Sequence, residues 1–153
     1  MKKEVFLSRS PEETESIGAR LASTLAGGVC VGLAGELGSG KTCFVRGMSI
    51  GLGEKGSIKS PSFTIMNIYS GGRLKLYHID LYRLKSEEEF YGAGLDEYIC
   101  GPDISVIEWA DRFTGIMDRC DVIIRFSVIS ETERELIVEK RMNPAGKDRD
   151  EGI

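Results

Sequence analysis

The sequence predicts an α/β fold, with a partly parallel sheet that carries antiparallel hairpins and is flanked by helices. Three patterns lead to this class. A short apolar, β-branched run at 29–33 is followed directly by a glycine-rich turn and then by helical periodicity, as in a buried strand that leads into a helix. Two further pairs of strand-like runs, within 63–80 and 121–140, are each interrupted by a short turn signal, which predicts hairpins.

The first elements follow from local signals. Residues 3–8 are typical of a short strand, and residues 10–13 supply a serine cap, a proline and a capping-box acid that begin a helix. Apolar residues then recur every four positions, and Gly27 and Gly28 are expected to end this helix. After the strand at 29–33 and its glycine turn, a second helix is expected to stop at 51–53.

The later elements are shorter. The runs predicted as strands are 63–69, 73–80, 104–107, 121–129 and 133–140. Turns are expected at 70–72 and 130–132, where glycine, serine and polar residues gather. We expect residues 86–91 to be helical, 92–103 to form a loop, and a short helix to follow the strand that ends at Glu108.

Length and composition are those of one globular domain. The chain has 153 residues, of which 41% are hydrophobic and 29% charged, so we expect one domain over 1–142 and a polar, frayed tail at 143–153. The 20 basic and 24 acidic side chains give a net charge of −4. This balance argues against a strongly basic nucleic-acid-binding surface and predicts that any contact with RNA is indirect.

No targeting or membrane segment is evident. The longest uncharged stretch, 21–35, is shorter than the ~18 apolar residues of a membrane span, and 1–10 contains no apolar core of a signal peptide. We therefore expect a cytoplasmic protein without a membrane partner. The four cysteines have no CxxC spacing, which favours small buried side chains over disulfides or zinc ligands. They are Cys30, Cys43, Cys100 and Cys120.

The glycine-rich turn matches the pattern G-x-x-x-x-G-K-[ST] of phosphate-binding loops. Its glycines allow successive backbone N–H groups to face one concavity, and the helix that follows favours an anion at its N-terminus. Lys41 is expected to neutralise phosphate charge, and the Thr42 hydroxyl to bind Mg²⁺. The predicted nucleotide-binding residues of this loop are Gly35, Glu36, Leu37, Gly38, Ser39, Gly40, Lys41 and Thr42.

Two acidic residues end apolar strand runs, as the carboxylates of such a nucleotidase do. Asp80 ends the run that begins at 73, and Glu108 ends the run that begins at 104. Either alone is compatible with a solvated acid at the end of a strand. Together they predict that one holds Mg²⁺, directly or through water, while the other orients the attacking water. The sequence leaves open which does which.

Three other features have two interpretations each. The segment 60–64 is either a strand entry fixed by proline or a switch whose hydroxyls sense the γ-phosphate. His78 shares a strand face with Asp80, although a lone strand histidine is more typical of a structural residue. Trp109 is either a core residue or an aromatic contact near the site or at a partner surface.

With these motifs on hand, the chain resembles the TsaE family, formerly YjeE, of small P-loop ATPases required to make threonylcarbamoyladenosine in bacterial tRNA. The match covers roughly residues 10–112. It rests on four motifs in matching order, LAGELGSGKT at 33–42, SPSFT at 60–64, HIDLYRL at 78–84 and IEW at 107–109. The resemblance implies a fold like that of P-loop NTPases.

The resemblance also implies roles for individual residues. Lys41 and Thr42 would bind nucleotide and Mg²⁺, Glu108 would be a metal ligand, and Asp80 would be needed at the metal and for turnover. Trp109 becomes a functional rather than a core residue.

Other implied roles rest on shorter matches. Ser62 stands where the family usually has threonine and keeps a hydroxyl, so Ser62 and Thr64 remain candidates for a switch. Ala110 replaces a frequent proline, which affects local loop geometry only. An adenine pocket near the first helix and the late hairpin would involve Ser10 and Arg134.

The function implied is that of a Mg²⁺-dependent ATPase that drives or resets the TsaB and TsaD subunits of the tRNA-modification complex. Because no motif marks an arginine as a catalytic arginine finger, we expect slow ATP hydrolysis by the protein alone and faster hydrolysis when the partners are bound. A small-molecule kinase and a nucleotide-sensing adaptor without turnover remain alternatives. A GTPase is disfavoured because the chain contains no N-K-x-D sequence.

Overall fold

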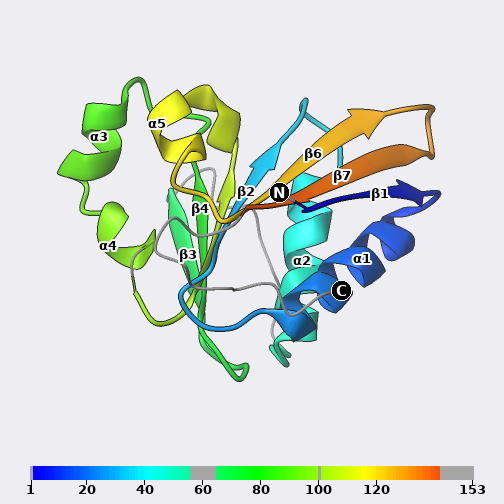
Figure 1. Ribbon diagram of the computed structural model, residues 1–153, viewed down its shortest axis with the longest axis horizontal. Helices are drawn as coiled ribbons and strands as arrows, with labels where there is room; N and C mark the ends of the chain where they lie inside the picture. The colour runs from blue at the N-terminus through cyan, green and yellow to red at the C-terminus, as the bar shows by residue number, and fades with distance from the viewer. Residues whose placement is uncertain (1, 56–64, 100, 142–153) are drawn as a thin grey trace.

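The computed structural model describes residues 2–55, 65–99 and 101–141, which form a sheet with helices on both faces (Figure 1). The strands are β1 (Lys2–Ser8), β2 (Cys30–Ala34), β3 (Met66–Tyr69), β4 (Leu76–Asp80), β5 (Ile104–Glu108), β6 (Val122–Val128) and β7 (Arg134–Lys140). The helices are α1 (Pro11–Thr24), α2 (Lys41–Gly51), α3 (Glu87–Gly92), α4 (Asp96–Ile99), α5 (Thr114–Met117) and the 3₁₀ turn η1 (Ala110–Arg112).

The seven strands lie in the order β1-β7-β6-β2-β5-β4-β3. The four central strands β6, β2, β5 and β4 are parallel, whereas β7 is antiparallel to both β1 and β6, and β3 is antiparallel to β4. This arrangement confirms the predicted α/β fold with a partly parallel sheet and antiparallel hairpins. Because β2, β4 and β5 are parallel, their carboxyl ends meet at one edge of the sheet, where α/β proteins commonly bind ligands.

The sheet separates two hydrophobic clusters, and strand alternation sends neighbouring side chains to opposite ones. In β5, for example, Val106 packs in the cluster beneath α1 and α2, while Ile107 packs in the cluster beneath α3, α4 and α5. Central members of the first cluster are Leu21, Leu33, Phe44, Met48, Ile124 and Leu136. Central members of the second are Ile79, Phe90, Ile116 and Ile123.

Helix α1 begins at the predicted cap. The Ser10 hydroxyl accepts a hydrogen bond from the Glu13 backbone N–H at 3.1 Å, and the Glu13 carboxylate accepts one from the Arg9 N–H at 2.8 Å. The helix ends at Thr24, before the two glycines that were expected to stop it. Leu25 is already extended, with φ −78° and ψ 136°.

Helices α1 and α2 run parallel in direct backbone contact. The Cys43 thiol donates to the Pro11 carbonyl at 3.1 Å, near the N-termini of both helices. Further along, a Cβ on Gly47 would lie 2.0 Å from the Glu15 carbonyl oxygen. Only glycine permits this approach, so the two helix N-termini are held side by side.

The structure differs from two of the predicted elements, and in both cases tertiary contacts decide the outcome. Residues 92–103, expected to be a loop, contain α4. Strand β4 begins at Leu76 rather than at 73, because Arg73 serves the end of α1: its guanidinium donates to the carbonyls of Ala22 and Leu25 at 2.8 Å each. These carbonyls lie at a helix end, where intrahelical partners are missing.

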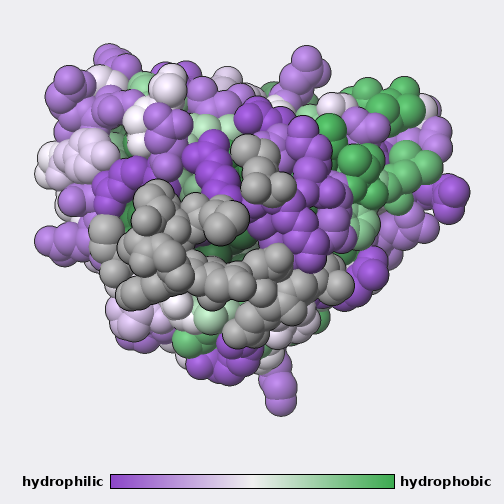
Figure 2. Space-filling model, in the orientation of Figure 1, coloured by the Kyte–Doolittle hydropathy of each residue, from purple (hydrophilic) through white to green (hydrophobic). Residues whose placement is uncertain are grey.

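The end of the sheet formed by β1, β6 and β7 presents apolar side chains to solvent. Figure 2 shows them as the green area at the upper right. They include Val5, Leu7, Val128 and Ile129, which are 47 to 61% exposed. On β1, Phe6 lies between Val5 and Leu7 and points to the other face of the sheet, where it packs against the first cluster.

Cys30 and Cys120 are free and buried, as expected of small core residues, whereas Cys43 is free and half-buried. Cys100 and the predicted tail at 143–153 lie outside the described residues. Within the described part of the chain, helices of a length and apolarity sufficient to cross a membrane are not found.

Candidate functional site

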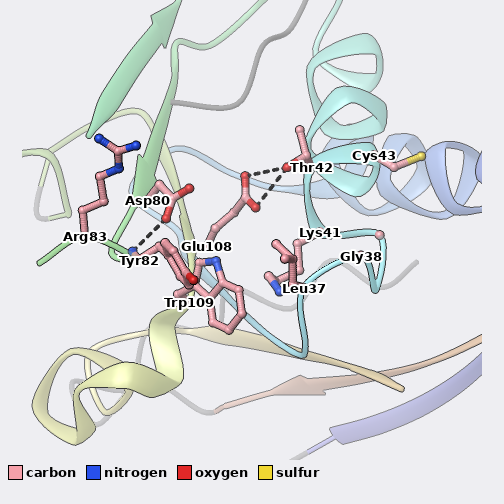
Figure 3. Close-up of a pocket in the computed structure, with 11 residues that line it drawn as sticks. Leu37, Gly38, Lys41, Thr42, Cys43, Asp80, Tyr82, Arg83, Glu108 and Trp109 are labelled. Carbon is pink, nitrogen blue, oxygen red and sulfur yellow. Dashed lines mark hydrogen bonds between the residues drawn. The ribbon is translucent and has the colours of Figure 1, made fainter. Parts of the chain in front are cut away.

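A pocket of about 460 Å³ opens at the carboxyl edge of the parallel strands (Figure 3). The glycine loop, residues 35–42, forms one wall, and the ends of β4 and β5 form the other. The lining residues are Leu37, Gly38, Gly40, Lys41, Thr42, Cys43, Asp80, Tyr82, Arg83, Glu108 and Trp109. The structure thus brings the predicted loop and both predicted acids together.

The glycine loop leads from β2 into α2 through left-handed backbone. Gly38 and Gly40 have φ of +77° and +106°, a region that side chains rarely adopt, and α2 begins at the next residue, Lys41. Among the described residues, no side chain caps this helix. Its first N–H groups therefore face the pocket as hydrogen-bond donors, an arrangement that suits an anion such as phosphate.

The Lys41 side chain is buried in the pocket wall, with only 5% of the residue exposed. Its ammonium donates to the carbonyls of Gly35 and Glu36, the latter at 2.9 Å, and lies against the face of the Trp109 ring. Burial lowers the pKa of Lys41, and the nearby carboxylates, Glu108 foremost, oppose that effect. A desolvated cation therefore lies at a helix N-terminus, whose N–H groups also favour an anion.

Trp109 adopts an unusual backbone conformation directly after β5. Its φ of 61° and ψ of 35° lie in the left-handed region, which is strained for a bulky residue. The indole packs against the Tyr82 ring, with centroids 5.1 Å apart. The strained turn therefore places the indole over the lysine, while the same side chain also packs against the edge of the second hydrophobic cluster.

Asp80 and Glu108 are register partners on adjacent parallel strands. The Thr42 hydroxyl donates to both Glu108 carboxylate oxygens, at 3.1 and 3.2 Å, which joins the start of α2 to the end of β5 (Figure 3). Asp80 accepts a hydrogen bond from the Tyr82 backbone N–H at 2.8 Å. Burial raises the pKa of Asp80, this N–H opposes the rise, and the Glu108 charge adds to it.

His78 lies on the same face of β4 as Asp80, as the two-residue period predicts, and it is fully buried. Its Nε2 is 2.5 Å from Glu108 Oε2. The residue favoured as structural on sequence grounds therefore contacts the candidate site directly. The position of His78 on the same strand face as Asp80 could have indicated a place near the site. The contact with Glu108 could not be predicted, because the sequence does not show that β5 is the neighbouring strand.

The donor set at this edge fits Mg²⁺. Thr42 supplies a hydroxyl, and Asp80 and Glu108 supply carboxylates, all from elements that meet at the pocket. Oxygen ligands of this kind are those that Mg²⁺ prefers. Sequence reasoning did not name Tyr82 and assigned no catalytic role to Arg83, yet both line the pocket and both belong to the HIDLYRL motif.

A second pocket of about 400 Å³ adjoins the first and shares Gly38, Gly40 and Cys43 with it. Ser10 and Arg134, predicted from the resemblance, both line it, and the Arg134 guanidinium donates to the Gly38 carbonyl at 3.3 Å. The lining also includes residues that no motif marked. These are Arg9, Pro11, Thr14, Glu131 and Thr132.

The remaining predicted site residues, Ser62 and Thr64, lie outside the described residues. Their role as a switch stays a prediction.

Comparisons with known proteins all point to one family, and the matches cover most of the chain. Residues 8–136 match the model of a family described as threonylcarbamoyl adenosine biosynthesis protein TsaE. The chain is 41% identical over 132 residues to the tRNA threonylcarbamoyladenosine biosynthesis protein TsaE of Treponema pallidum, covering 86% of this chain and 97% of that relative. It is 37% identical over 138 residues to the protein of the same name from Bacillus subtilis, covering 89% of this chain and 85% of the relative. In structure it is similar to Bacillus subtilis YdiB, with a TM-score of 0.75 and 32% identity over 91% of this chain and 86% of that one.

Proposed function

The chain belongs to the TsaE family of tRNA threonylcarbamoyladenosine biosynthesis proteins, and we propose that it serves this pathway as a Mg²⁺-dependent ATPase. Membership confirms the resemblance drawn from the four sequence motifs. The family name supports the pathway, and the pocket geometry supports the reaction.

One observation carries the proposal: the Thr42 hydroxyl at the start of α2 is hydrogen-bonded to the Glu108 carboxylate at the end of β5. The contact sets the oxygen ligands for Mg²⁺ beside a helix N-terminus that favours phosphate. Lys41 adds a positive charge on the same side of the pocket. A metal site and a polyphosphate site in contact are what nucleotide hydrolysis requires.

The two adjoining pockets together have the form expected for a whole nucleotide. Phosphates would occupy the first pocket, and the nucleoside the second, where Ser10 and Arg134 lie. Two of the three residues that line both pockets, Gly38 and Gly40, have no side chain to separate them. ATP is favoured over GTP because the guanine-reading N-K-x-D sequence is absent from the chain.

The protein groups divide the chemical work. Lys41 and the N–H groups of the glycine loop would neutralise and orient the phosphate oxygens. Thr42 and Glu108, already in contact, would hold Mg²⁺, which supplies charge neutralisation when bound. Asp80, facing Glu108 across the strand pair, would orient the attacking water.

Hydrolysis would drive or reset the TsaB and TsaD subunits of the modification complex in the cytoplasm, with tRNA contacted only indirectly. The charge of −4 on the chain supports the indirect relation to tRNA. In the described part of the chain, the arginine that lines the first pocket is Arg83, just after β4, and no motif marks it as an arginine finger. We therefore expect slow turnover by the protein alone and faster turnover when the partners are bound.

The test is ATP hydrolysis measured with and without TsaB and TsaD, comparing the wild type with Lys41→Ala. We expect partner-stimulated phosphate release that the substitution abolishes. Stimulation that survives Lys41→Ala would contradict both the site and the reaction. Transfer of phosphate to a metabolite would indicate the kinase alternative, and complex activity that persists in Asp80→Ala and Glu108→Ala would indicate the adaptor.

A further inference from the structure

The Glu108 carboxylate is held from two sides by protein groups. On one side the Thr42 hydroxyl donates to both of its oxygens. On the other side His78 Nε2 lies 2.5 Å from Oε2. Glu108 is 3% exposed and His78 is fully buried, so solvent has little access to this contact.

The histidine is in turn positioned by a second residue. The Tyr69 hydroxyl is 3.5 Å from His78 Nδ1, and the Asn67 amide donates to the Tyr69 oxygen at 3.3 Å. A ring that donates from Nε2 to Glu108 and accepts at Nδ1 from the Tyr69 hydroxyl satisfies both contacts. The order is then Asn67 to Tyr69 to His78 to Glu108, with each N–H or O–H donating to the next group.

We propose that His78 is a positioning residue that fixes the Glu108 carboxylate for Mg²⁺, with Tyr69 fixing the ring of His78. The inference rests on the proposed function. An N–H bond to Oε2 restricts rotation of the carboxylate and leaves lone pairs on both oxygens for the metal or its water. Hydrogen-bonded groups behind metal ligands commonly set ligand orientation, and their loss costs about 10- to 100-fold in metal affinity or activity.

The position of His78 supports this role over that of a simple core residue. It occupies β4 two residues before Asp80, and its register partner on β5 is Val106, two residues before Glu108. A core residue at this place would be apolar, like Leu76 on the same face of β4. A buried ring whose two nitrogens both meet polar groups is instead part of a hydrogen-bonded network.

The test compares two amide substitutions that differ in reach. His78→Gln places an N–H near the position of Nε2, whereas His78→Asn places it near Nδ1 and leaves Glu108 without this donor. ATP affinity is measured by calorimetry in EDTA and across a Mg²⁺ titration, and Mn²⁺ binding with ADP is followed by electron paramagnetic resonance. Thermal unfolding of each variant reports on folding.

We expect His78→Asn to leave ATP affinity in EDTA unchanged while the Mg²⁺ midpoint rises about 10- to 100-fold. His78→Gln should restore a midpoint close to that of the wild type. An unchanged midpoint in His78→Asn, or an equal loss in both variants, would overturn the inference.

If His78→Asn does not fold, Tyr69→Phe decides, because it removes only the hydroxyl behind the ring. We expect its Mg²⁺ midpoint to rise about 2- to 10-fold, the value of one hydrogen bond, and an unchanged midpoint would overturn the inference. A wild-type protein whose ATP affinity does not respond to Mg²⁺ would instead contradict the proposed function itself.

Discussion

The ammonium nitrogen of Lys41 lies 3.7 Å from the centroid of the Trp109 indole ring. This distance is well within the range of a cation–π interaction, and the burial of Lys41 strengthens it because less water competes. The indole reaches this place only through the left-handed backbone of Trp109, which costs about 1–3 kcal/mol for a non-glycine residue. The fold thus accepts strain at the residue that covers its candidate catalytic lysine.

Replacement of Trp109 should lower ATP hydrolysis in proportion to the aromatic surface lost. Trp109→Ala removes the face over Lys41, so we expect kcat/KM to fall about 2- to 30-fold, equivalent to the ~0.5–2 kcal/mol of a cation–π contact. Trp109→Phe keeps a ring and should lose less. Steady-state kinetics of both variants, with circular dichroism as a check on folding, measures this. Equal losses in the two variants would contradict the role given to the ring.

Asp80→Asn should stabilise the fold in a pH-dependent way while it impairs hydrolysis. Because the pKa of Asp80 is raised in the folded protein, the folded state keeps its proton at pH values where the unfolded state has lost it. The unfolding free energy of the wild type therefore decreases as pH rises above the ordinary value of 3.8 and through the raised pKa. The asparagine variant lacks this decrease.

The measurement is urea unfolding of the wild type and Asp80→Asn, without Mg²⁺, from about pH 3.5 to pH 8. The two proteins should differ least at the acid end and most at neutral pH, with the variant more stable. A wild type that gains stability relative to Asp80→Asn as pH rises would show that the carboxylate is favoured in its charged form, contrary to its burial.

Contact between α1 and α2 should make Gly47 intolerant of even one methyl group. In Gly47→Ala the new Cβ would meet the Glu15 carbonyl at 2.0 Å, so we expect a loss of about 1–3 kcal/mol in unfolding free energy. Gly92→Ala is the matched control, because a Cβ there meets nothing within 4 Å. It should be neutral or stabilising by up to about 1 kcal/mol in thermal unfolding. Similar stabilities for both variants would contradict the close helix contact.

Arg134→Ala should weaken the binding of a nucleotide more than that of a bare polyphosphate. Arg134 lines the second pocket, where the nucleoside is proposed to lie. We expect the Kd for ATP to rise several-fold while the Kd for tripolyphosphate, measured by competition, changes much less. Arg125→Ala serves as the control, because Arg125 pairs with Glu139 and lines neither pocket. Equal losses of affinity for the two ligands would contradict a role for Arg134 in binding the nucleoside.

Local sequence was sufficient to predict those parts of the candidate site whose residues are close together in the chain. The glycine loop and Lys41 belong to one strand–loop–helix unit, and the ends of β4 and β5 are marked by an acid after an apolar run. The order of the strands in the sheet could not be predicted in this way, because it depends on contacts between segments that are distant in the chain. The register of Asp80 with Glu108, and with it the contact of His78 with Glu108, required the structure.

The same limit explains the errors in the fold. Arg73 looked like a strand residue because the turn before it is rich in glycine, yet its guanidinium bonds carbonyls of α1 that lie 48 and 51 residues earlier. Helix α4 has only four residues, too few for a periodic pattern. Both depend on tertiary packing rather than on local preference.

The parallel contact of α1 with α2 also places the starts of both helices at the candidate site. Ser10, directly before α1, lines one pocket, and Lys41, the first residue of α2, lines the other. The close backbone approach at Gly47 and the hydrogen bond from Cys43 to the Pro11 carbonyl hold the starts of the two helices side by side. In the proposed nucleotide site, this arrangement would favour a ligand that is long enough to reach both pockets.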